Sequence, residues 1–91
     1  MKETIFYEVC YDAEAEIEYT GVLEEKDERP GPIHCFKWVE RYTEAIFDSG
    51  EGEAEAWIED DKIQIEDYGV MLPRQVEGYI EKYMQEHVLK K

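Results

Sequence analysis

Two stretches of the sequence place an acidic side chain at nearly every second position. The first set consists of Asp12, Glu14, Glu16 and Glu18, and the second of Glu51, Glu53, Glu55 and Glu59. Side chains at this spacing on a β-strand project from one face about 6.6 Å apart. Such a row presents regularly spaced negative charge, somewhat as a phosphate backbone does. The chemistry that it favours is charge pairing with lysine and arginine side chains.

Paired carboxylates can also act as general acid and base, or bind Mg²⁺ or Ca²⁺. Catalysis requires two carboxyl groups in unlike environments, usually in a cleft, so that their pKa values differ. An exposed row offers neither condition. The turn at Glu59-Asp60-Asp61 lacks the spacing of a calcium-binding loop, and the glycines form no phosphate-binding loop. The sequence therefore predicts that the chain is not an enzyme.

Histidine and cysteine supply the other ligand types. His34, Cys35, Cys10 and His87 could bind zinc by type, but they lack a recognised spacing. A reactive thiol needs basic surroundings, and bases are scarce in this chain. We expect His34 on the polar side of a helix and His87 at the end of an apolar stripe. We predict no metal site and no cofactor.

The charge balance restricts the class of partner. Twenty-four acids against ten bases give a net charge of −14. This charge repels nucleic acids and anionic membranes, so a basic protein is the expected partner. The acids could instead serve either of two roles that need no partner. Exposed glutamate can simply keep strands soluble and unpaired at their edges, and surface acid can retain water in concentrated salt.

The length of 91 residues fits one domain with one modest core. No stretch approaches the roughly 20 apolar residues of a membrane span. An acid at Glu3 does not fit the basic start of a signal peptide. Two cysteines are too few for a disulfide scaffold and suit a reducing compartment. We expect a cytoplasmic protein, in the host cytoplasm if a phage encodes it.

The two halves of the chain resemble each other. Residues 17–23 (IEYTGVL) are echoed by residues 65–71 (IEDYGVM), and residues 38–42 (WVERY) by residues 79–83 (YIEKY). The repetition predicts a pseudo-repeat that covers about residues 3–48 and 53–89 of a single domain.

Alternation of apolar and polar residues predicts four strands. They cover residues 3–11, 12–21, 53–59 and 62–66, and Asp60-Asp61 provides a two-residue turn that tolerates positive φ.

Three-and-four spacing of apolar residues predicts helices over residues 33–47 and 73–89. Pro32 suits the first helical position, and Ser49-Gly50 suits a helix end. Ile33 to Val39 could instead form a strand, because the segment is rich in aromatic and β-branched residues. Its echo in the clearly helical residues 73–89 favours the helix.

These elements predict an α+β fold built from a duplicated ββα-ββα unit. Its four-stranded, mainly antiparallel sheet has two helices packed on one face and an acidic open face. Small residues let the helices approach the sheet closely, namely Ala13, Ala15, Ala54 and Ala56. The order of the strands stays open.

The predicted function is that of a small acidic inhibitor that occupies the cationic nucleic-acid-binding groove of a partner protein. Phage anti-CRISPR and anti-restriction proteins form this general class. The alternatives are an immunity protein against a toxic nuclease, a structural subunit or homodimer that assembles through its open sheet or edge strands, and an enzyme-like domain that binds a metal or small molecule. The predicted partner-binding residues are six acids and two aromatic anchors: Glu14, Glu16, Glu18, Glu53, Glu55, Glu59, Trp57 and Phe6.

Overall fold

The computed structural model of the chain describes residues 2–8, 12–23, 32–42, 50–69 and 72–89. Within these residues, five strands form one antiparallel sheet, and a helix follows them. The elements are β1 (Lys2–Glu8), β2 (Asp12–Leu23), β3 (Ile33–Tyr42), β4 (Gly50–Glu59), β5 (Lys62–Gly69), α1 (Arg74–Met84) and a π-helical turn, η1 (Gln85–Leu89). The strands lie side by side in chain order, β1-β2-β3-β4-β5.

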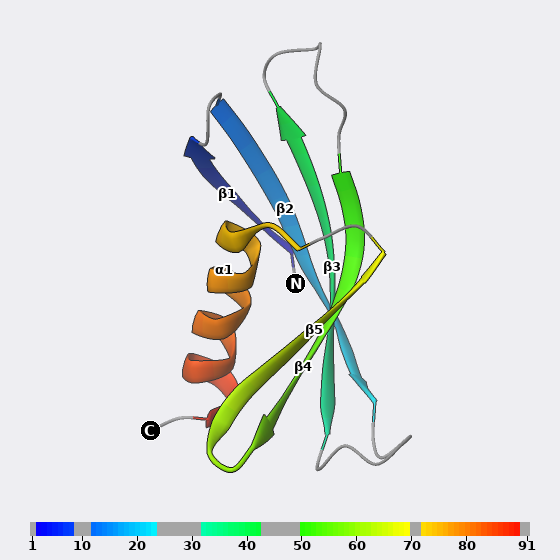
Figure 1. Cartoon of the computed structure of the whole chain (residues 1–91), viewed down its shortest axis with the longest axis vertical. Coiled ribbons are helices and arrows are strands. Elements are labelled where there is room, and N and C mark those ends of the chain that lie inside the picture. Colours follow the sequence, from blue (N-terminus) through cyan, green and yellow to red (C-terminus); the bar gives the residue numbers. More distant parts are fainter. Residues whose placement is uncertain (1, 9–11, 24–31, 43–49, 70–71, 90–91) are drawn as a thin grey trace.

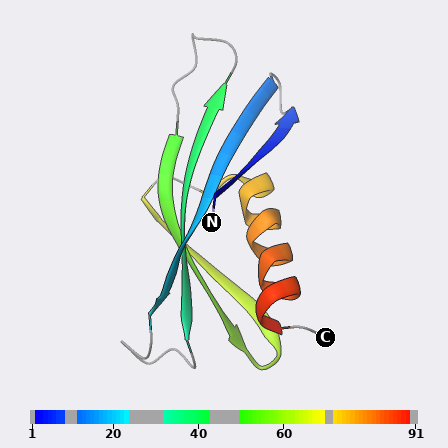
Figure 2. The same ribbon diagram turned by 180° about the vertical axis from the view of Figure 1, so that it is seen from behind.

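The sheet is strongly twisted, and α1 lies along one side of it (Figure 1). The helix runs from the middle of the sheet toward the end where β4 turns into β5. The view from behind shows the same arrangement (Figure 2). Within the described part of the chain, no helix is long and apolar enough to cross a membrane.

The predicted duplicated ββα unit is wrong. Residues 33–42 form the central strand β3, not a helix, and pair with β2 on one side and β4 on the other. The sheet therefore has five strands instead of four, with one helix instead of two. The alternative assignment of Ile33 to Val39 to a strand is the correct one. Residues 43–47 of the predicted helix lie outside the described residues.

Other predictions from periodicity are confirmed. Both predicted hairpin strands of each half are present, although residues 9–11 lie outside the described part. Asp60 and Asp61 have φ angles of 55° and 62°, which is the left-handed conformation of a tight two-residue hairpin turn. The predicted C-terminal helix is α1 with its continuation η1.

The core lies between α1 and the sheet. Val76, Ile80 and Met84 recur at four-residue spacing, and all three side chains are fully buried. The predicted small residues Ala13, Ala15, Ala54 and Ala56 are buried as well. Phe36 and Trp38 of β3 fill the space between these alanines and are also fully buried. Large side chains on the central strand and small ones on its neighbours thus allow one short helix to cover the core.

Candidate functional site

The register of the sheet assigns each strand residue to one of two faces, because directly paired residues project to the same side. One face packs against α1. We call the opposite face, which no described helix covers, the open face. Among the described strand residues it carries ten acids and four bases. The acids are Glu8, Asp12, Glu14, Glu16, Glu18, Glu51, Glu53, Glu55, Glu59 and Glu66, and the bases are Lys2, Lys37, Arg41 and Lys62.

All eight predicted partner-binding residues lie on the open face, but the two aromatic ones are far apart. Phe6, whose side chain is 76% exposed, pairs with Glu14 near one end of the sheet. Trp57 pairs with Gln64 near the other end, and its Nε1 donates a hydrogen bond to Glu59 at 3.3 Å. In the register of the sheet, the positions of Phe6 and Trp57 lie roughly 25 Å apart along the strand direction, at about 3.3 Å per residue. Phe6 and Trp57 therefore cannot form a single apolar anchor.

Eight of these ten acids form two rows on either side of β3, and the other two, Glu8 and Glu66, lie on the outer strands β1 and β5. One row follows β2 and the other follows β4, so the rows lie about 10 Å apart, two strand spacings. The register through β3 places Glu16 level with Glu51, and Glu18 level with Glu53. The two rows therefore run alongside each other.

The central strand adds two bases to this face. Lys37 lies between Glu18 and Glu53, and Arg41 pairs with Glu14. The helix predicted over residues 33–47 does not place either base on the sheet. The position of Lys37 and Arg41 among the acids of the open face was therefore not predicted from the sequence. The alternative assignment of residues 33–39 to a strand would have placed Lys37 among the acids.

A tyrosine links two acids that face each other. Glu55 and Glu66 are direct cross-strand partners, an arrangement that costs stability when both are charged. The Tyr68 hydroxyl shares its proton with Oε1 of Glu55 and Oε2 of Glu66, each at 3.0 Å. Burial, aided by these two carboxylate acceptors, raises the pKa of Tyr68 to about 12. Tyr68 therefore remains a donor at neutral pH and partly offsets the repulsion.

A hollow of about 230 Å³ lies beside this tyrosine. Its lining combines the acids Glu53 and Glu55 with Cys35, Lys37 and Tyr68 of the open face. Cys35 is half-buried there. The hollow therefore extends from the end of β2 across β3 and β4 to Tyr68 of β5.

Two polar clusters on the helix-bearing face are structural. Buried Glu40 accepts hydrogen bonds from the hydroxyls of Tyr7 and Tyr42, the latter at 3.0 Å. Two donors satisfy the buried carboxylate, which would otherwise be costly to bury. Burial and the bond to Glu40 raise the pKa of Tyr7. His34 also lies on this face, 2.9 Å from the Tyr19 hydroxyl, so its predicted place on the polar side of a helix is wrong.

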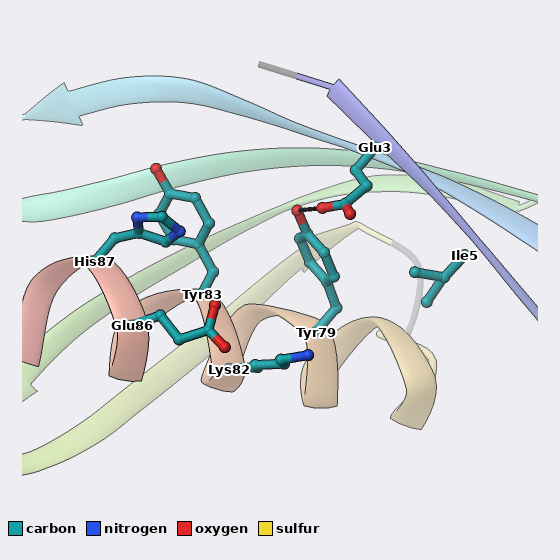
Figure 3. A pocket seen from close by; sticks show the side chains of 7 residues that line it. All are labelled: Glu3, Ile5, Tyr79, Lys82, Tyr83, Glu86 and His87. Atoms are coloured by element: carbon teal, nitrogen blue, oxygen red, sulfur yellow. Dashed lines mark hydrogen bonds between the residues drawn. The ribbon is translucent and has the colours of Figure 1, made fainter. Parts of the chain in front are cut away.

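A second hollow, of about 210 Å³, lies between β1 and α1 (Figure 3). The Tyr79 hydroxyl donates a hydrogen bond to Glu3, and the ring of His87 lies against Tyr83 with centroids 4.5 Å apart. Burial and the bond to Glu3 raise the pKa of Tyr79. The hollow is smaller than typical ligand pockets of roughly 300–1,000 Å³. The bond between Tyr79 and Glu3 connects the edge strand β1 to the helix.

The described residues offer no group of three or more histidine, cysteine or acidic side chains placed to hold a metal ion. Cys10, one of the four candidate ligand residues considered from the sequence, lies outside these residues. Comparisons with protein-family models, with curated proteins and with solved structures found no match to this chain. The fold and the open face therefore define the class: an α+β domain with one strongly acidic sheet surface.

Proposed function

We propose that the chain is a small acidic inhibitor that binds, through its open face, the nucleic-acid-binding groove of a basic protein. The observation that supports the proposal is the gathering of ten acids and only four bases among the described strand residues of the open face. Lysine and arginine in such a groove bind phosphates by charge and release counterions. Rows of carboxylates compete for the same side chains and exclude the nucleic acid.

Solubility alone explains the arrangement less well. A soluble face needs charge, but it can interleave both signs. Here the four bases do face acids, but they are too few to separate all of them: Glu8 faces Asp12, and Glu55 faces Glu66, across adjacent strands. Each like-charged pair costs up to about 1 kcal/mol. An acidic surface that tolerates this cost is consistent with one that is neutralised on binding.

The spacing of the two rows favours a partner that binds a duplex. The rows lie about 10 Å apart across β3, and the two backbones of B-DNA flank a major groove about 12 Å wide. A groove that takes two phosphate rows can accept both carboxylate rows at once.

A pair of matched triple variants tests the proposal. One replaces Glu14, Glu16 and Glu53 of the open face by glutamine. The control replaces Glu77, Glu81 and Glu86, all exposed on the helical segment, and has the same net charge. Capture from lysate at low salt identifies the partner, and the purified partner is then loaded with a labelled DNA duplex. We expect the unaltered chain to displace the duplex, and the control variant to displace it at the same concentration. The open-face variant should need at least about a tenfold higher concentration for the same displacement.

Circular dichroism verifies that both triple variants are folded. Displacement by the open-face variant at the same concentration as the unaltered chain would contradict the proposal. An equal loss in both variants would contradict it as well, because net charge and not the open face would then govern binding.

A further inference from the structure

The strand β1 has an uncovered edge. It forms one side of the sheet, so alternate backbone N–H and C=O groups point away from β2. Five of its seven residues are exposed, and Phe6 at 76% is the most exposed large apolar side chain among the described residues. The pairing with β2 runs through all seven residues without a bulge. Strand β1 thus lacks the bulges and prolines that natural edges use to avoid pairing.

We infer that two copies of the chain associate through β1, edge to edge and antiparallel, to form one sheet that is continuous across both copies. With the two-fold axis at Ile5, all seven residues of the strand find a partner. The pairs are Ile5 with Ile5 and, each occurring twice, Thr4 with Phe6, Glu3 with Tyr7, and Lys2 with Glu8. Every pair joins residues of the same face, as antiparallel pairing requires.

This register is chemically self-complementary. Lys2 faces an acid, Phe6 faces a β-branched residue and Ile5 faces its own copy, and all three kinds of cross-strand pair are favourable. Lys2 lies 3.4 Å from Glu16 of its own chain, so its ammonium is already held on the open face near the edge. The same two-fold axis turns both open faces to one side. The acidic rows of two copies would then form one surface.

Neighbouring registers fit less well. Moving the axis to Thr4 or to Phe6 pairs only five residues and leaves Glu8 or Lys2 without a partner strand residue. A shift of one residue opposes side chains of different faces. The charges at the two ends of β1 therefore select the register centred on Ile5.

The opposite edge of the sheet is less suited to self-pairing. Strand β5 carries Asp67 on the helix-bearing face, where Oδ2 accepts the backbone N–H of Leu72 at 3.1 Å. Pairing of β5 with its copy about Ile65 would place Asp67 opposite Ile63. An inward-pointing charge is one of the devices that keep edges apart. Glu3 of β1 also lies on this face, but the register about Ile5 places it opposite Tyr7, whereas Asp67 would face an aliphatic side chain. We therefore assign the contact to β1.

Charge exchange tests the assignment. The variants are Lys2→Glu, Glu8→Lys and the double variant, and the measurement is sedimentation equilibrium over a roughly hundredfold range of protein concentration. We expect the unaltered chain to dimerise. Each single change places two like-charged pairs at the interface and should weaken dimerisation about tenfold. The double variant should recover most of that loss. Because Lys2 also contacts Glu16, the recovery separates the contact between copies from effects within one chain.

A cross-link provides a second measurement. In a chain with Cys10 and Cys35 changed to serine, Ile5→Cys should form a disulfide-linked dimer under mild oxidation, because directly paired strand residues lie within disulfide reach. Ile65→Cys, the residue that would face its own copy if β5 were the contact, is the matched control and should remain monomeric. A chain that stays monomeric at every concentration would overturn the inference. So would a double variant that recovers nothing, or a cross-link at position 65 instead of position 5. The open-face glutamine variant should still dimerise, so failure here is distinct from failure of the proposed function.

Discussion

His34 is the residue whose setting has the most direct solution consequence. Its Nδ1 lies 2.9 Å from the Tyr19 hydroxyl, and its Nε2 is buried without a hydrogen-bond partner among the described residues. Burial lowers the pKa of His34, because the charged imidazolium would lose its hydration. The folded chain therefore holds His34 in its neutral form.

This setting predicts a loss of stability in mild acid. The unfolded chain binds a proton at His34 near the ordinary pKa of about 6.5, whereas the folded chain resists it. The contribution of neutral His34 to the free energy of unfolding is fully present above that pH. It is lost as the pH falls toward the lowered pKa of His34 in the folded state. We expect the midpoint of thermal unfolding to fall between about pH 7 and pH 5. In His34→Phe, which keeps a ring beside Tyr19, the fall should be smaller. An identical fall in both proteins would contradict the assignment to His34.

At the level of elements, β4 lies close against β3 because of one glycine. A Cβ atom on Gly52 would lie 3.0 Å from Trp38 Cζ2 and 3.0 Å from the carbonyl oxygen of Tyr68. At Gly50 the nearest atom of Trp38 would be 3.7 Å away, an ordinary contact. The fully buried indole thus occupies the space that a side chain at position 52 would need.

Matched alanine substitutions test this packing. Gly52→Ala should lower the free energy of unfolding by about 1–3 kcal/mol, because Trp38 and the β5 backbone must both shift. Gly50→Ala should change it by less than about 1 kcal/mol, since no close contact arises and the unfolded chain loses some freedom. Urea unfolding measures both values. Equal losses in the two variants would show that the indole is not the obstacle.

The elements that could be predicted from the sequence are those with a clear single periodicity. The helical stripe at Val76, Ile80 and Met84, the alternation of the acidic strands and the turn at Asp60-Asp61 all belong to this kind. The central strand could not be predicted in the same way, because it buries a charged residue. Glu40 takes a core position that only the two tyrosine hydroxyls make acceptable, and this breaks the apolar alternation of Phe36 and Trp38.

The internal echo reinforced that error. Residues 38–42 (WVERY) and 79–83 (YIEKY) are similar in sequence, yet one segment pairs within the sheet and the other forms a helix. Similar short sequences adopt different structures when their tertiary surroundings differ. The acids of β2 and β4 were placed correctly because each strand alternates by itself. The bases Lys37 and Arg41 were missed because their segment, residues 33–42, was predicted to be a helix and forms strand β3.

At the scale of the whole molecule, the fold separates apolar packing from charge. The principal dimensions are 41 × 26 × 21 Å, and α1 lies on only one side of the sheet. Most of the charged residues on the other side, the open face, are acids. The whole chain has a net charge of −14. Repulsion among these acids opposes folding, since the unfolded chain can spread the same charges apart.

The stability of the whole molecule should therefore increase with salt. Screening shortens the reach of charge from about 30 Å at 0.01 M to about 8 Å at 0.15 M ionic strength, so the free energy of unfolding should rise over this range. The variant with glutamine at Glu14, Glu16 and Glu53 should be more stable than the unaltered chain at low salt, by up to about 1 kcal/mol, and should respond less to salt.

The variant at Glu77, Glu81 and Glu86 should respond more like the unaltered chain. Equal salt dependence in all three would show that the open face is not the source of the repulsion. A gain in stability together with a loss of duplex displacement would indicate that these acids are retained for binding at a cost to folding.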